Sequence, residues 1–203
     1  MTLTALLQHI IQHDSLHAKL LNTLSLLENI GARKISASEN AHTTTLMVLK
    51  HAAEEHRHAY YLKKQITRLG IRENPTYHPD YLIAPIASKH YLQLLDLKTS
   101  RYLRDRLHLH GAELKFAAYL LVTYAIEVRA DQLYPVYQAA LQQAGSKVSV
   151  RSIIVEEQGH LEEMIIQLKE FSVDWESHAA YICAIEEQLH TGWTNALIKD
   201  SIA

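Results

Sequence analysis

Cysteine is nearly absent from this sequence, which contains only Cys183 among its 203 residues. A single thiol cannot form an intrachain disulfide, and it cannot build the thiolate cages that hold structural zinc or iron-sulfur clusters. A reducing, cytoplasmic setting is therefore expected.

The chain also lacks a strong charge of either sign and any long apolar run. A formal net charge of −2 and an isoelectric point near 6.7 give no electrostatic reason to expect nucleic acid or an anionic membrane as the main partner. The longest nearly apolar run, Phe116 to Ile126, is too short to span a bilayer and is interpreted as part of a buried helix. Residues Met1 to Ser15 lack the basic start of a signal peptide.

Glycine and proline are scarce, with six and four residues respectively, whereas residues that favour helices are abundant. This composition predicts an all-α protein, and the length predicts one domain over residues 1–203. Gly31 with the stretch Ser36 to Thr43, and Gly70, are expected to end the first two helices, and Pro135 is expected to kink a later one. The apolar periodicity predicts helices at about Leu3 to Ile30, Thr44 to Leu69, Ser88 to His108, Ala112 to Gln143, Val148 to Glu170 and Asp174 to Ile198.

Two of these predicted helices carry a glutamate and a histidine three residues apart. Glu157 and His160 lie in one helix, and Glu55 and His58 repeat the spacing in another. Positions i and i+3 share a face of an α-helix, so each pair can reach the same metal ion. Apolar residues mark that same face, which aims both pairs into a core.

A lone glutamate precedes each pair in the preceding bundle helix. Glu28 lies 27 residues before Glu55, and Glu127 lies 30 residues before Glu157. The order Glu, Glu-x-x-His, Glu, Glu-x-x-His resembles the ferritin-like di-iron carboxylate superfamily, in which four helices hold two metals with this ligand set. The resemblance extends from Glu28 to His160.

This resemblance implies an up-down-down-up four-helix bundle over about residues 3–170, with the predicted helix at Ser88 to His108 as the crossover and an additional C-terminal helix over about 174–198. It implies two iron ions as cofactor, with manganese or a mixed pair as an alternative. Dioxygen or peroxide, an external electron donor and an unidentified small-molecule substrate are the implied partners, and a homodimer is compatible with the pattern. The implied metal ligands are Glu28, Glu55, His58, Glu127, Glu157 and His160.

The Glu-x-x-His spacing occurs twice more in the sequence. Glu39 and His42 fall in a polar turn, where capping is the simpler role, and Glu187 and His190 on the last helix form the alternative metal pair. Along the hairpin, Glu127 lies 18 residues before Gly145 while Glu157 lies 12 residues after it, a mismatch of about 9 Å at helical rise. A kink at Pro135 or a non-helical start of the fourth bundle helix could absorb it.

Three neighbours are candidates to support the ligands. His51 lies one turn before Glu55, and Asp131 could either replace Glu127 or accept a hydrogen bond from a ligand histidine. Tyr124, one turn before Glu127, is a candidate for electron transfer.

The leading functional interpretation is a dioxygen-activating oxidase or oxygenase. A ferroxidase, an iron-storage protein or a peroxide-detoxifying protein of the same superfamily is the alternative, although the lack of paired cysteines argues against a rubredoxin-type iron site. A non-enzymatic docking protein is the third interpretation. Its surface would be the C-terminal helix or the basic face of the crossover helix, which is most simply solvated. That face consists of Lys98, Arg101, Arg104, Arg106, His108 and His110.

Overall fold

The computed structural model describes residues 1–39, 42, 44–71 and 75–202, and the described residues form helices and no strand. The all-α prediction is therefore confirmed. Parts of the predicted turn at Ser36 to Thr43, and residues 72–74, which follow the helix end predicted at Gly70, lie outside the described residues. The α-helices are α1 (Leu3–Ile11), α2 (Asp14–Ser38), α3 (Leu46–Gln65), α4 (Pro85–Leu107), α5 (Gly111–Gln143), α6 (Arg151–Phe171) and α7 (Trp175–Ser201), with short 3₁₀ turns at Ile66–Leu69 and Pro79–Tyr81.

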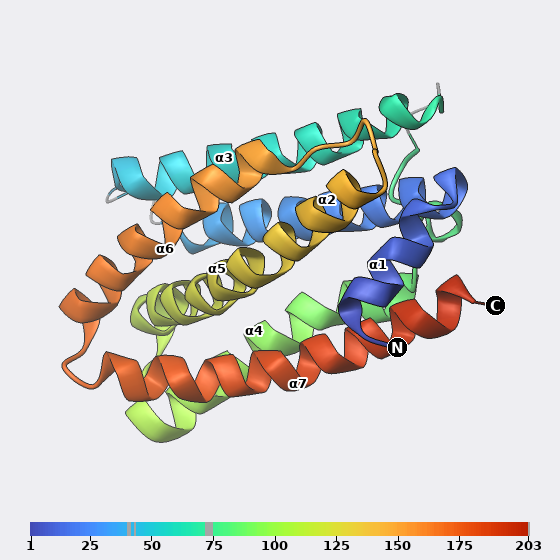
Figure 1. Ribbon diagram of the computed structural model, residues 1–203. Helices are drawn as coiled ribbons and strands as arrows, with labels where there is room; N and C mark the ends of the chain where they lie inside the picture. The colour runs from blue at the N-terminus through green and yellow to red at the C-terminus, as the bar shows by residue number, and fades with distance from the viewer. Residues whose placement is uncertain (40–41, 43, 72–74, 203) are drawn as a thin grey trace.

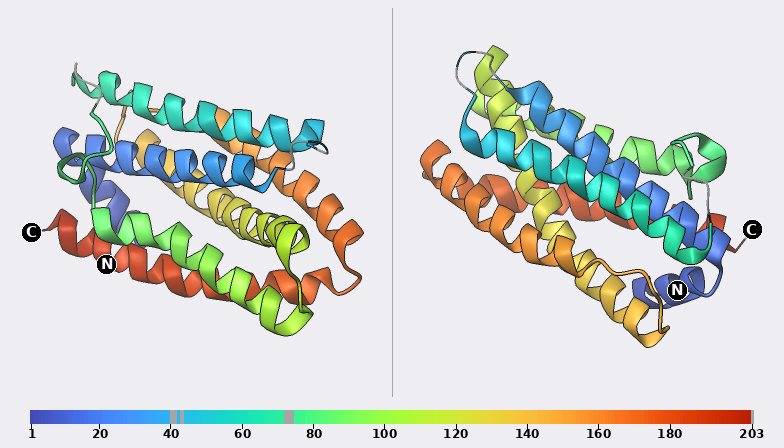
Figure 2. Two further views of the ribbon diagram at one scale, coloured as in Figure 1. Left: turned by 180° about the vertical axis from the view of Figure 1, so that it is seen from behind. Right: turned by 90° about the horizontal axis from the view of Figure 1, so that it is seen from above.

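Two helical hairpins form the centre of the molecule. α2 packs against α3, and α5 packs against α6, so each hairpin joins neighbours in the sequence. Between the hairpins, α4 carries the chain back along the length of the molecule, and α3 and α5 consequently run in the same direction (Figure 1). α7 lies beside α4 and α5, and together α4 and α7 cover one side of the hairpins (Figure 2).

The first predicted helix begins at Leu3 as expected, but it is interrupted and ends later than predicted. The chain leaves the helical conformation at His13, whose backbone is extended (φ −123°, ψ 100°), so that α1 and α2 are separate helices. α2 then continues through Gly31 and ends at Ser38. A single glycine inside a helix costs only about 1 kcal/mol. Gly31 also lies beside Glu55, where an added Cβ would be 3.7 Å from Glu55 Oε2.

The fourth bundle helix begins later than the sequence predicts. α6 starts at Arg151, and residues 146–150 are non-helical. A non-helical residue can advance the chain by up to roughly 3.3 Å compared with 1.5 Å in a helix, so five such residues can add up to about 9 Å. This non-helical start can absorb the mismatch between Glu127 and Glu157. α5 continues through Pro135 to Gln143.

Apolar side chains pack in two clusters. One joins α1 and α2 to the C-terminal parts of α5 and α7, and the other joins α4 and the N-terminal part of α5 to α6 and α7. Within the predicted apolar run, residues Ala117 to Val122 are buried whereas Phe116 is exposed. Among the described residues, the helices do not combine the length and apolar character that a bilayer crossing needs. All six side chains of the predicted basic face on and after α4 are exposed.

Candidate metal centre

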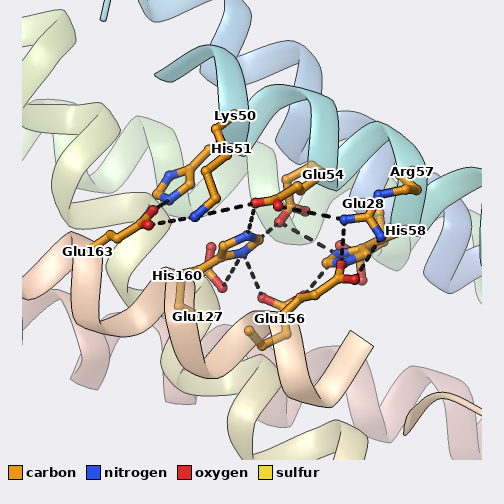
Figure 3. Close-up of polar contacts among 12 residues, drawn as sticks. Glu28, Lys50, His51, Glu54, Arg57, His58, Glu127, Glu156, His160 and Glu163 are labelled. Atoms are coloured by element: carbon orange, nitrogen blue, oxygen red, sulfur yellow. Dashed lines mark hydrogen bonds and ion pairs between the residues drawn. The ribbon is translucent and has the colours of Figure 1, made fainter. Parts of the chain in front are cut away.

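Each of the four central helices contributes acidic or imidazole side chains to one buried cluster. α2 supplies Glu28 and α5 supplies Glu127, while α3 and α6 each supply a Glu-x-x-His pair. Among those labelled in Figure 3, the side chains of Glu28, His58, Glu127 and His160 point toward one another between the helices. The structure thus brings together all six residues that the resemblance implied.

The cluster contains two overlapping groups of possible metal ligands. In each group, one ligand atom from every residue lies within 4.8 Å of all the others. Both groups include Glu55 and Glu157, whose carboxylates each have two oxygens and can bridge two ions. The first group is Glu28, Glu55, His58 and Glu157, and the second is Glu55, Glu127, Glu157 and His160.

The Nδ1 atoms of both histidines face the shared carboxylates. His58 Nδ1 lies 3.0 Å from Glu157 Oε1, and His160 Nδ1 lies 3.2 Å from Glu157 Oε2. His160 Nδ1 is also 3.5 Å from Glu55 Oε1. Although it is buried, His58 Nδ1 has no well-oriented hydrogen-bond partner among the described residues. A buried nitrogen left in this state fits a metal ligand better than a structural hydrogen bond.

The opposite ring nitrogens are held by two further glutamates that the sequence analysis missed. His58 Nε2 lies 2.7 Å from Glu156 Oε2, and His160 Nε2 lies 2.7 Å from Glu54 Oε2. Each glutamate therefore orients the histidine of the other helix (Figure 3). Arg57 holds Glu156 through two hydrogen bonds of 2.7 Å. Such carboxylate partners fix the tautomer of a metal-binding imidazole and leave its other nitrogen free for the ion.

A sequence signal for these partners exists. Both motifs read Glu-Glu-x-x-His, with the additional glutamate directly before the ligand candidate. Adjacent helical positions point about 100° apart, so the second carboxylate of each motif cannot share its neighbour's direction. It reaches across to the facing helix instead.

Burial and mutual repulsion raise the pKa of three of the four central carboxyls. Burial is the larger cause for Glu55 and Glu127, and the charges of neighbouring carboxylates add to it. Burial also raises the pKa of Glu28, although a hydrogen bond with Glu55 opposes the shift. Burial acts in the same direction on Glu157, but its contacts with Glu127 and both histidines hold its pKa well below the usual range.

The pKa values of the two histidines shift in the opposite sense to that of a simple buried imidazole. Burial lowers the pKa of His160, but Glu157 and Glu54 outweigh this effect and raise it to about 9. The pKa of His58 is likewise raised, because its contacts with Glu157 and Glu28 outweigh burial. Protons on these rings therefore balance part of the carboxylate charge, and a cation bound here would replace them.

Tyr134 and His51 also adjoin the cluster. The Tyr134 hydroxyl donates a hydrogen bond to Glu28 Oε1, and burial followed by the Glu28 charge raises its pKa well above normal, so it keeps its proton. Tyr134 lies seven residues after Glu127, two turns along the same face of α5. The predicted neighbour His51 packs against His160 with ring centroids 4.7 Å apart, and its Nε2 is 2.8 Å from Glu163 Oε2.

The other predicted neighbours on α5 do not point into the cluster. Asp131 is exposed, because its position is rotated by roughly 40° from that of Glu127 around the helix. Tyr124 is rotated by roughly 60° and packs against Trp175 of α7, with ring centroids 6.0 Å apart. Glu54 and Glu156 take the hydrogen-bonding role that was expected of Asp131.

The alternative Glu-x-x-His pairs lie elsewhere. Glu187 is exposed and pairs with Arg129, and His190 lies on the same helix. Glu39 is the C-terminal cap residue of α2, with its backbone N–H bonded to Ser36 O at 3.3 Å. The described residues that could hold a metal ion are those of the two overlapping groups.

The donor set fits a hard or borderline divalent cation. Carboxylate oxygens dominate each group, and a single imidazole nitrogen completes it. This combination suits iron or manganese, and four central carboxylates can balance the charge of two divalent ions. No family model, curated protein or solved structure matches the chain. The geometry alone therefore carries the functional argument.

The overlap of the two groups predicts different metal losses for different glutamates. Glu157→Gln should abolish binding of both ions because Glu157 belongs to both groups, whereas Glu28→Gln should remove about one ion per chain. Elemental analysis of metal-loaded protein, with far-ultraviolet circular dichroism to check helicity, measures both effects. Glu187→Ala is the matched control and should retain both ions. Full occupancy in the Glu157 variant would refute the shared-ligand geometry.

Removing the charge of Glu54 or Glu156 should weaken metal binding without destroying the site. Glu54→Gln and Glu156→Gln are each expected to lower metal affinity by roughly 10- to 100-fold, because the ligand histidine loses its orienting acceptor. Competition with a chromophoric chelator measures the affinity. Glu162→Gln, at an exposed position of α6, should leave it unchanged. Equal affinities in all three variants would contradict the orienting role.

The stabilisation of the folded protein by bound metal should depend on pH. In metal-free protein, the raised pKa values of Glu28, Glu55 and Glu127 mean that the folded state binds protons more readily than the unfolded state. Lowering pH from 8 to 5 thus stabilises the metal-free form through these carboxyls, and His160, with its pKa of about 9, acts in the same direction down to its unfolded pKa near 6.5.

Protons compete with metal for the same atoms, so the metal-loaded form gains no such stability. We expect the difference in melting temperature between the two forms to shrink steadily from pH 8 to pH 5. The comparison cancels histidines remote from the site, such as His17, whose pKa burial lowers to about 4. A difference that is constant over this range would contradict convergence of the carboxylates on one metal site.

Proposed function

We propose that this protein is a ferritin-like di-iron carboxylate enzyme, an oxidase or oxygenase that uses dioxygen to oxidise a small organic molecule. The observation that carries the proposal is the sharing of Glu55 and Glu157 between two groups of buried ligands. Shared carboxylates hold two ions close together, which suits a reaction at a metal pair. The return of the chain along α4 and the parallel course of α3 and α5 support the ferritin-like assignment.

A pair of iron ions held here would supply the redox chemistry with dioxygen. For an oxygenase, one C–H bond and O₂ together with two electrons and two protons yield C–OH and water. The electrons would come from an external donor, since the single cysteine cannot support a cysteine-bound iron centre in the chain.

The protein's own residues prepare the site for this reaction. Glu156 and Glu54 keep the Nε2 protons of the two histidines, so that both Nδ1 atoms point inward. Tyr134 fixes one oxygen of Glu28 by donating its hydroxyl hydrogen. Such fixed neighbours hold ligands in place while open coordination positions change.

An apolar cavity beside the carboxylates favours an organic substrate over iron storage. The cavity has a volume of about 320 Å³, and Glu28, Glu55 and Glu127 form part of its wall. The remaining wall is mainly aliphatic and aromatic. A path for hydrated Fe(II) would instead need an acidic lining, because desolvating a divalent ion among apolar groups is costly.

A purely structural or docking role explains the cluster poorly. Glu55, Glu127 and Glu157 are all at least 94% buried. Buried carboxylates without a compensating cation destabilise a fold by repulsion and lost hydration. Hydrophobic residues in these positions would serve a docking protein better.

Oxygen consumption by iron-loaded protein tests the proposal. Anaerobically reduced protein with about two Fe(II) per chain should consume on the order of one O₂ per iron pair, and excess Fe(II) should not accumulate on the protein. An oxygen electrode and subsequent iron analysis measure both quantities. Protein carrying Glu55→Gln should lose the rapid consumption. Continued uptake to hundreds of irons per assembly would instead identify a storage protein.

A further inference from the structure

The cavity beside the metal centre lies between α2, α4, α5 and α7. Its α2 residues extend from Leu24 to Ala37, which corresponds to about 20 Å of helix. A volume of about 320 Å³ spread over this length leaves a narrow channel, at the lower end of the roughly 300–1,000 Å³ typical of ligand sites. The shape suits a slim chain better than a fused ring system.

The lining offers no free charge for a ligand among the described residues outside the metal centre. Arg129 is held by Glu186 through hydrogen bonds of 2.9 and 2.7 Å and also pairs with Glu187. Lys34 pairs with Asp96. A charged ligand would lose its hydration in the channel without gaining a counter-ion. These paired side chains therefore favour a neutral ligand.

The imidazole of His190 lines the cavity, and one of its two nitrogens lacks a partner among the described residues. His190 of α7 is 7% exposed, and its Nε2 is the nitrogen without a hydrogen-bond partner there. The Tyr91 and Trp193 rings flank it, with centroids 6.3 and 5.6 Å away. Burial, followed by the charge of Arg129, lowers the pKa of His190, so the ring is neutral near pH 7. A buried nitrogen left unpaired is costly, and a ligand can satisfy it.

We propose that this cavity binds a neutral, mainly aliphatic molecule with one hydroxyl or carbonyl group, which hydrogen-bonds to the His190 imidazole while the alkyl chain lies along the metal-centre carboxylates. This assignment names a substrate class for the proposed oxidase or oxygenase and rests on that function only for the reaction. The apolar wall supplies affinity by burying the chain, and the single imidazole supplies specificity for the polar group.

Binding is tested with 1-octanol, 1-fluorooctane and octanoate as probes. Isothermal titration calorimetry gives the affinities. Trp193 provides a second readout, because in Trp175→Phe protein it is the remaining tryptophan of the sequence and it lines the cavity. We expect saturable binding of 1-octanol, with octanoate at least about tenfold weaker because its charge must be desolvated. Equal or tighter binding of octanoate would overturn the proposal.

The role of His190 is tested by the ratio of two affinities. His190→Leu should reduce the preference for 1-octanol over 1-fluorooctane by about five- to tenfold, since only the alcohol loses a hydrogen bond. His190→Gln retains a polar group and should keep most of the preference. A uniform loss of affinity for both probes in His190→Leu, with helicity unchanged, would reject the hydrogen bond, because a structural defect does not distinguish them.

The location is tested by filling the channel. Ala130 lines the cavity, whereas Ala139 is exposed on the same helix. Ala130→Phe should weaken 1-octanol binding by at least about tenfold, since added bulk occupies the alkyl path, and Ala139→Phe should not. Equal affinity of the two variants would place the probe elsewhere and refute the proposal.

Metal content is measured on the same samples so that the two proposals can fail separately. Metal-loaded protein that shows none of the expected 1-octanol binding would reject the substrate class and leave the di-iron assignment intact. Protein that binds 1-octanol through His190 but takes up no metal would reject the di-iron function and retain the binding site.

Discussion

Mutual repulsion among four clustered carboxylates, three of them buried and the fourth, Glu28, partly buried, is the constraint on which the rest of the structure depends. Glu28, Glu55, Glu127 and Glu157 come from four different helices, so the repulsion acts directly on the contacts between the hairpins. The two apolar clusters, at either end of the Glu/His group, hold the helices together against this repulsion. Folding thus supplies a preformed space of negative charge, and its stability rises when protons or cations enter.

Much of this arrangement follows from the sequence. The helical period and the scarcity of glycine and proline predict the central helices, and inward-facing polar positions predict the meeting of Glu55, His58, Glu157 and His160. These features are local, because a helix fixes which side chains share a face. The spacing of Glu28 and Glu127 could be interpreted only through the superfamily resemblance, since a lone glutamate on a helix is usually solvated.

The rest depended on relations between helices. α2 continues through Gly31 because tertiary packing outweighs a local propensity cost of about 1 kcal/mol. The contact between Glu54 of α3 and His160 of α6 depends on the relative rotation of the two helices, which no local sequence pattern predicts. His190 shows the same limit. Its spacing from Glu187 suggested a metal pair, but the fold turns Glu187 toward Arg129 and places His190 in the cavity wall.

The two sides of the metal centre differ in polarity, although its ligands are arranged almost symmetrically. On the α3 and α6 side, the histidines contact the carboxylates of Glu54 and Glu156, whose side chains are 22% and 26% exposed. On the α2 and α5 side, apolar residues meet Glu28 and Glu127 across the cavity. The first side therefore connects the histidines to partly exposed groups, while the second presents mainly apolar surface to the cavity. In the proposed oxygenase reaction, protons are consumed as one oxygen atom of O₂ is reduced to water, whereas the C–H bond belongs to the organic molecule. Separate polar and apolar sides suit such a reaction, because water in the channel would compete with the substrate for the same space.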